Sequence, residues 1–197
     1  ASDRLSLGYS LASAAMVAGL FGFLLSVQQV FEHVLHMPEA LPAGFAIMAI
    51  GMSAAALANA SIVKRYGMRL IGHGALLFFI VVAGIHLVFA LYGEETFFTF
   101  VGLQMLMMIA FPFVMGNFGA MAMERMGHVA GMANALQGSI ANVAGIIGGT
   151  LVGQAFNGTT VPLYIGAMAG GIIALVIVIV TEGGKLFVAR NAKAEDE

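Results

Sequence analysis

Two histidines and two glutamates lie close together at residues 32–39, in the order Glu32, His33, His36 and Glu39. Imidazole nitrogens and carboxylate oxygens are common ligands of zinc and other first-row metals. The segment also contains Pro38 and follows a long apolar run, a pattern typical of a turn at the end of a helix. We therefore interpret it as a solvated connection and predict no metal site.

The remaining histidines and acids do not form a recognisable catalytic set. His86 lies in an apolar stretch, where an ionisable side chain is a candidate for function because its burial is costly. A hydrogen bond to a neighbouring helix is the simpler interpretation. His128 follows Glu124 and Arg125, and we expect it to order a turn. The pattern shows no nucleophile–base pair and the chain has no cysteine, so we predict neither an enzyme nor a cofactor.

Amide, methionine and aromatic side chains form a second group of interest. Gln104, Met108 and Phe111 follow one another at spacings of four and three residues, which places them on one face of a helix. Buried amides need hydrogen-bond partners, and bonds between helices would provide them. Alternatively, such side chains can contact varied amphipathic molecules in a wet cavity. We predict a substrate cavity of this kind, formed by Gln28, Gln104, Met108 and Phe111.

The composition indicates that membrane-spanning helices position these residues. Hydrophobic residues make up 60% of the chain and charged residues 9%, compared with about 25% charged residues in a soluble domain. Crossing the hydrocarbon core takes about 20 helical residues, and lipid offers no partner to unpaired backbone groups. The apolar runs therefore predict an all-α membrane protein with six transmembrane helices, at about residues 9–33, 42–62, 70–92, 97–119, 129–154 and 161–181.

The lysines and arginines can all be placed on one side of this membrane. The eight residues are Arg4, Lys64, Arg65, Arg69, Arg125, Lys185, Arg190 and Lys193. Because cytoplasmic loops are enriched in Lys and Arg, we predict that both ends are cytoplasmic. Residues 1–8 would form the N-terminal end, residues 9–181 the bundle and residues 182–197 the tail. Glu32 and Glu182 lie at span ends, and we expect both to reach water.

Glycine spacing in the fifth span predicts a contact between helices. Gly145, Gly149 and Gly153 recur at every fourth residue and so lie along one helix face. Small residues let membrane helices approach closely, and we expect this face to pack against another helix. The two sets of three spans show no clear internal repeat.

Several segments together resemble a known family of membrane carriers. The basic segment KRYGMR at residues 64–69 resembles the cytoplasmic loop motif of the major facilitator superfamily. Residues 116–124 and 127–138 resemble the junction of the tenth and eleventh helices of its Bcr/CflA-type multidrug efflux transporters. Residues 7–12 resemble the start of that family's seventh helix. The resemblance covers nearly the whole chain, as the C-terminal six-helix half of a twelve-helix fold.

The resemblance implies a proton-coupled carrier of drugs or other small amphipathic molecules in the bacterial inner membrane. Transport would proceed by alternating access between two six-helix halves. The first and fourth spans would line the central cavity, the second and fifth would meet the other half, and the third and sixth would face lipid. Lys64, Arg65, Gly67 and Arg69 would form the cytoplasmic loop motif and hold neighbouring helix ends together. The family's proton-coupling acid belongs to the half that has no counterpart in this sequence.

Two features leave other interpretations open. Met132 and Asn134 stand where the family often has Thr and Ser, and the span centres contain no Asp, Glu, Lys or Arg. The second feature favours an accessory or structural subunit that packs into a larger membrane complex and has lost transport. A homodimeric carrier is a third interpretation. The expected partners are thus the lipid bilayer with a second half, a second copy or a larger complex, and nothing indicates nucleic-acid binding.

Overall fold

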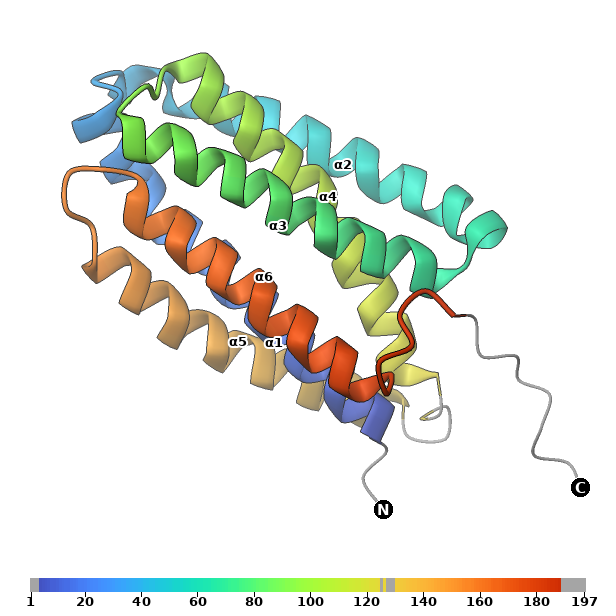
Figure 1. Cartoon of the computed structure of the whole chain (residues 1–197). Helices are drawn as coiled ribbons and strands as arrows, with labels where there is room; N and C mark the ends of the chain where they lie inside the picture. Colours follow the sequence, from blue (N-terminus) through green and yellow to red (C-terminus); the bar gives the residue numbers. More distant parts are fainter. Residues whose placement is uncertain (1–3, 125, 127–129, 189–197) are drawn as a thin grey trace, which may run out of the picture.

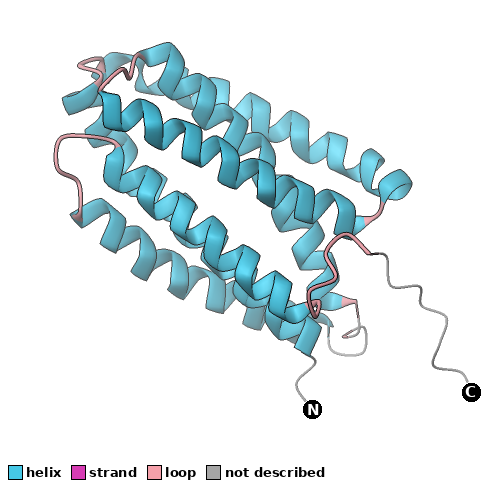
Figure 2. Ribbon diagram, viewed as in Figure 1, coloured by secondary structure: helices cyan, strands magenta, loops and turns pink. Residues whose placement is uncertain are grey.

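The protein is an all-helical bundle in a computed structural model that describes residues 4–124, 126 and 130–188. Its six long helices run side by side (Figures 1 and 2). Each is long and apolar enough to cross a membrane, so the prediction of a multi-pass membrane protein is confirmed. The helices are α1 (Arg4–Gln29), α2 (Leu41–Tyr66), α3 (Met68–Tyr92), α4 (Phe97–Met123), α5 (Ala130–Gln154) and α6 (Val161–Thr181).

The connections show why the helices begin and end where they do. A π-helical turn, Val30–Val34, extends α1, and a 3-10 turn, Pro38–Ala40, leads into α2. Gly67 separates α2 from α3 with a φ of 82°, which a residue with a side chain rarely adopts. The side chain of Thr96 accepts a hydrogen bond from the Thr99 backbone N–H and so caps the start of α4. Helix α1 begins at Arg4, earlier than the predicted first span.

Helices α1–α3 and helices α4–α6 form two sets with matching contacts. Helix α1 packs against α5 and α6, and α4 packs in the same way against α2 and α3. The two sets also meet through α1 with α4 and through α3 with α6. Each set contains three helices that alternate in direction, so α4 starts at the end of the bundle opposite to the start of α1. The second set is therefore inverted relative to the first. This relation was not visible in the sequence.

Glycines bring α1 unusually close to its neighbours. A Cβ atom added at Gly149 would lie 2.7 Å from the Cβ of Phe21, and one added at Gly148 would lie 2.6 Å from the Cβ of Ala18. On the other side of α1, a Cβ added at Gly170 would lie 2.8 Å from the carbonyl oxygen of Ala15. Only hydrogen occupies these positions, so α5 and α6 can both approach α1. As a result α1 lies at the centre of the bundle.

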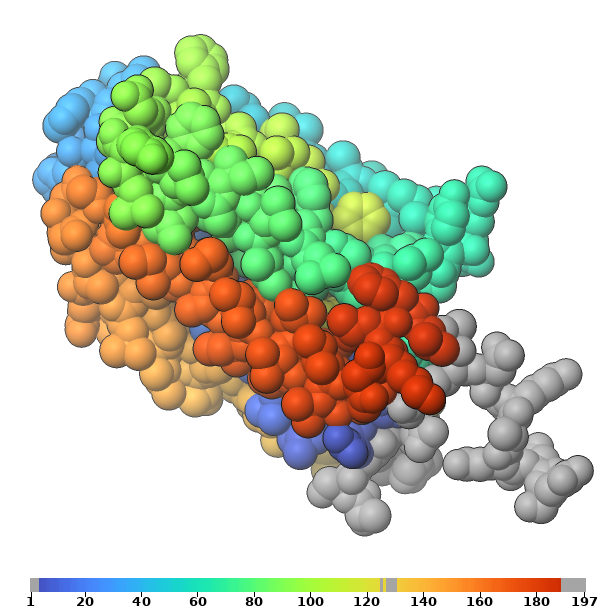
Figure 3. Space-filling view, in the orientation of Figure 1, coloured from blue at the N-terminus to red at the C-terminus, as the bar shows by residue number. Residues whose placement is uncertain are grey.

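The exposed surfaces of the helices differ in chemistry. On α3 and α6 the exposed side chains within the spans are aliphatic or aromatic, such as Val81, Ile85 and Ile173. The side chains of these two helices cover the middle of the surface in the space-filling view (Figure 3). Helix α5 instead exposes amide and hydroxyl side chains among its apolar ones, namely Asn134, Ser139, Asn142, Thr150 and Gln154. The bundle therefore has one side suited to lipid and another side that is partly polar.

We predict that Gly149→Ala lowers the stability of the bundle by about 1–3 kcal/mol, the usual cost of overpacking. The added methyl group would meet Phe21, including its backbone carbonyl carbon at 2.9 Å. Gly138→Ala is the matched control, because a Cβ at that position on the same helix has nothing within 4 Å. Thermal unfolding in mild detergent measures both variants. Equal midpoints would contradict the close approach of α1 and α5.

Candidate functional site

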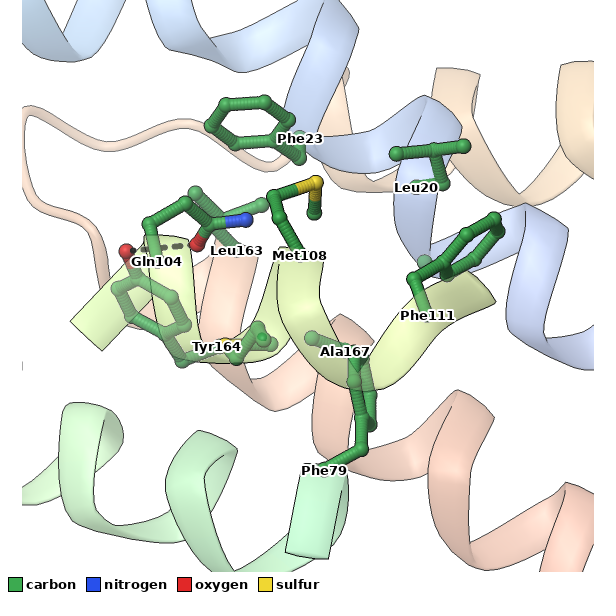
Figure 4. Close-up of a pocket in the computed structure, with 11 residues that line it drawn as sticks. Leu20, Phe23, Phe79, Gln104, Met108, Phe111, Leu163, Tyr164 and Ala167 are labelled. Carbon is green, nitrogen blue, oxygen red and sulfur yellow. Dashed lines mark hydrogen bonds between the residues drawn. The ribbon is translucent and has the colours of Figure 1, made fainter. Parts of the chain in front are cut away.

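Three of the four residues predicted for the substrate cavity lie together. Gln104, Met108 and Phe111 project from α4 into a small cavity, where they meet side chains of α1, α3 and α6 (Figure 4). The other lining residues are Gly19, Leu20, Phe23, Phe79, Met107, Leu163, Tyr164 and Ala167. The hydroxyl of Tyr164 donates to Oε1 of Gln104 over 3.5 Å, a long and weak hydrogen bond. The cavity is thus apolar with one polar corner.

This cavity is too small for a drug within the chain alone. Its volume is about 10 Å³, roughly the room that one water molecule needs, whereas pockets for drug-sized ligands measure about 300 Å³ or more. Gln104, Met108 and Phe111 are all buried in the bundle core. Gln28 is exposed on α1 and does not line the cavity. Helical spacing therefore grouped the residues of α4, but it did not place the residue from α1.

A charge network, buried at Arg69 and Glu182 and partly exposed at Glu124, closes the end of the bundle at which α1 begins and α6 ends, which we term the basic end. Arg69 of α3 pairs with Glu124, just beyond α4, and with Glu182, just beyond α6, at 3.0 Å in each case. Glu182 is 2% exposed, so the expectation that it reaches water was wrong. Tyr9 of α1 also donates its hydroxyl to Glu182 over 2.6 Å. One carboxylate thus joins α1, α3 and α6.

His73 extends this network toward the C-terminal segment. Its Nε2 lies 3.0 Å from the Tyr9 hydroxyl, and its Nδ1 accepts the backbone N–H of Phe187 at 3.2 Å. The Phe187 ring also packs edge-on against the His73 ring. The segment after α6 is therefore held over the start of α3. Sequence reasoning missed His73 and Tyr9, because their hydrogen bonds connect residues far apart in the chain.

The loop residues predicted with Arg69 behave differently from it. Lys64, Arg65 and Gly67 are exposed, and the Arg65 guanidinium lies over the Tyr66 ring at 5.3 Å from its centroid. Only Arg69 of this motif enters the charge network. Every described lysine and arginine belongs to this end: Arg4, Lys64, Arg65, Arg69 and Lys185. The predictions for Arg125, His128, Arg190, Lys193 and residues 1–3 concern positions outside the described residues.

The opposite end, which carries the acidic connections and is termed the acidic end, buries a second pair. Nε2 of His86 lies 2.9 Å from Oε1 of Glu95, and their side chains are 0% and 4% exposed. The hydroxyl of Thr160 donates to the other carboxylate oxygen of Glu95. The Tyr164 ring stacks on His86 with 3.6 Å between ring centroids. The sequence drew attention to His86, but Glu95 looked like an ordinary acid of an outer loop.

The remaining predicted residues lie outside these two networks. Gly145, Gly149 and Gly153 face α1, where their nearest neighbours are Phe21 and Leu25. Glu32, His33, His36 and Glu39 are all exposed. Within the described part of the chain, no group of three or more His, Asp or Glu side chains could hold a metal ion. No family model, curated protein or solved structure matches the chain.

We predict that Arg69→Gln destabilises the bundle by about 3–5 kcal/mol, because it removes a cationic partner of the buried carboxylate of Glu182. Lys64→Gln is the control: it removes the same charge from an exposed position of the same motif, and we expect a change of no more than about 0.5 kcal/mol. Thermal or denaturant unfolding of the purified protein compares the two variants. Similar losses in both would show that Arg69 acts only through the net charge of this end.

Proposed function

We propose that this chain forms one six-helix half of a carrier of the major facilitator type, which expels small amphipathic molecules by alternating access. In this proposal the basic end faces the cytoplasm of a bacterial inner membrane, following the positive-inside rule. The substrate binds between this half and a second six-helix half. The observation that carries the proposal is the polar exposed surface of α5.

Helix α5 exposes groups that lipid cannot satisfy. Asn142 and Thr150 are exposed within the span, and Gln154 is exposed at its end. Amides left without partners in hydrocarbon cost several kcal/mol each. Exposed residues of α3 and α6, such as Val81 and Ile173, need no such partners. The α5 surface is therefore suited to a water-filled cavity or a second protein surface, and the α3 and α6 surfaces are suited to lipid.

The inverted arrangement of the helices supports the same function. Helices α2 and α5 hold equivalent positions, because each packs mainly against the first helix of the opposite set. Each is therefore left with a broad exposed face. On α2 this face is rich in alanine, including Ala46, Ala49, Ala54 and Ala56, which permits close packing against another helix. Inverted sets of three helices with a site at their interface are typical of such carriers.

The Arg69 network is suited to act as the gate of the basic end. It joins the ends of α3, α4 and α6 through Arg69, Glu124 and Glu182. Opening this end would require these ion pairs to separate or to rearrange together. A closed state that depends on a few strong contacts can switch between two discrete arrangements, which is what alternating access needs.

Cysteine labelling tests the polar surface. The chain contains no cysteine, so single replacements can be read without background. We predict that Asn142→Cys in intact membranes reacts with a membrane-impermeant maleimide at least severalfold faster than Ile173→Cys. Both positions are exposed in this chain, but only the α5 position would face water in a carrier. Equal protection of both positions would favour the accessory subunit, whose α5 would be covered by a dry protein contact.

Transport provides the decisive test of function. We predict that Gln104→Ala, in cells that contain the complete native complex and lack other drug pumps, changes the relative efflux of a panel of amphipathic dyes severalfold. Gln104 is the amide of the cavity among α1, α3, α4 and α6, and discrimination by such sites depends on a few polar groups. Asn157→Ala, in the exposed connection before α6, is the control. Efflux that is unaffected by loss of the whole chain would exclude a carrier.

A further inference from the structure

We propose that Glu95 and His86 form a proton-binding site at the acidic end of the bundle. The existence of the site depends only on the geometry of this chain. Its use in transport rests on the proposed function, in which it would exchange protons with the outer water. The resemblance to efflux carriers implies no proton-coupling acid in this half, and the span centres hold no carboxylate.

The two groups are held together away from solvent. His86 lies in α3 and is 0% exposed, and Glu95 lies in the connection before α4 with its side chain 4% exposed. Their contact of 2.9 Å is at ion-pair distance, although it is not aligned as a hydrogen bond. Nδ1 of His86 has no hydrogen-bond partner among the described residues. The imidazole can therefore accept or release a proton without breaking an existing bond.

The surroundings of the pair are mostly apolar and aromatic. The ring of Tyr164 from α6 stacks on His86, and Phe100 of α4 packs edge-on against it. Tyr164 is the titratable group that α6 places against the pair, and Thr160 adds a neutral hydroxyl. The other acids and histidines of this end are exposed: Glu32, His33, His36, Glu39 and Glu94. None of these side chains compensates a charge inside the site.

The net charge of the Glu95–His86 pair depends on how many titrating protons it holds. With no proton on either group the pair carries one negative charge, with one proton it is neutral overall, and with two it carries one positive charge. An uncompensated charge in apolar surroundings is costly, so the closed site retains a single proton. Release transfers this proton to water and leaves a carboxylate beside a neutral imidazole. That state favours movement of Glu95 toward solvent.

A change in the charge of Glu95 would act directly on the contacts between three helices. It immediately precedes Thr96, which caps α4, and it accepts a hydrogen bond from Thr160, which precedes α6. Its partner His86 belongs to α3. Loss of the proton would therefore loosen the junction of three helices at the acidic end. Tyr164 also links this junction to Gln104 in the central cavity.

Infrared difference spectroscopy of the purified chain in lipid vesicles, recorded between acidic and basic pH, tests the site directly. Because the pair shares a single proton, in the wild type we expect a buried carboxylic acid band and imidazolium bands, each of partial intensity, that disappear together over one pH interval. Glu95→Gln, which keeps the shape of the side chain, should lose that carboxyl band. His86→Gln should lose the matching imidazole bands. Glu94→Gln, which removes the neighbouring exposed carboxylate, should retain both.

The outcomes separate this inference from the proposed function. A wild-type carboxyl band that survives in Glu95→Gln, or imidazole changes that survive in His86→Gln, would overturn the proton site. Because either replacement alone can decide the matter, failure of one variant to fold leaves the other as the test. If the bands behave as expected but the native complex expels no dye, the proton site stands and the carrier function falls.

Discussion

The bilayer's lack of hydrogen-bonding partners is the constraint on which this structure depends. It forces the backbone into helices, and it also decides where ionisable side chains can lie. Most of each span is apolar, and the buried charged groups gather near the two ends of the bundle. At the basic end Arg69 is paired with Glu124 and Glu182. At the acidic end His86 is paired with Glu95. Glu124 is partly exposed, whereas Arg69, Glu182, His86 and Glu95 are buried where another helix end supplies a partner.

Close packing around α1 makes these pairings possible. Gly148 and Gly149 of α5 and Gly170 of α6 allow the two helices to approach α1 on different sides. This approach places the end of α6 beside the start of α1, where Tyr9 bonds to Glu182 and Arg4 bonds to the carbonyl of Val180. The glycines therefore do more than fill space. They bring together helix ends that carry polar residues, so that Arg69 and Glu182 meet out of contact with water.

The sequence predicted the spans, because helix length and hydropathy are local properties. Local spacing also put the described basic residues in the connections of one end and Gly145, Gly149 and Gly153 on one helix face. It did not predict the burial of Glu182 and Glu95, since a carboxylate at a span end is buried only if a separate helix end covers it. The same limit explains why Gln28 does not line the cavity together with Gln104. Spacing shows which residues share a helix face, but it does not give the rotation of one helix against another, and the two amides lie in different surroundings.

The two buried networks connect the same three helices at opposite ends. Arg69 joins the start of α3 to the ends of α4 and α6. His86, near the other end of α3, meets Glu95 before α4, which in turn bonds to Thr160 before α6. Rigid helices that are tied at both ends cannot separate at one end without pivoting about the other. If one network loosens while the second holds, the helices tilt and only one end opens. A proton at Glu95 and His86 would then bias which end that is, as a ligand biases any two-state equilibrium by binding one state better.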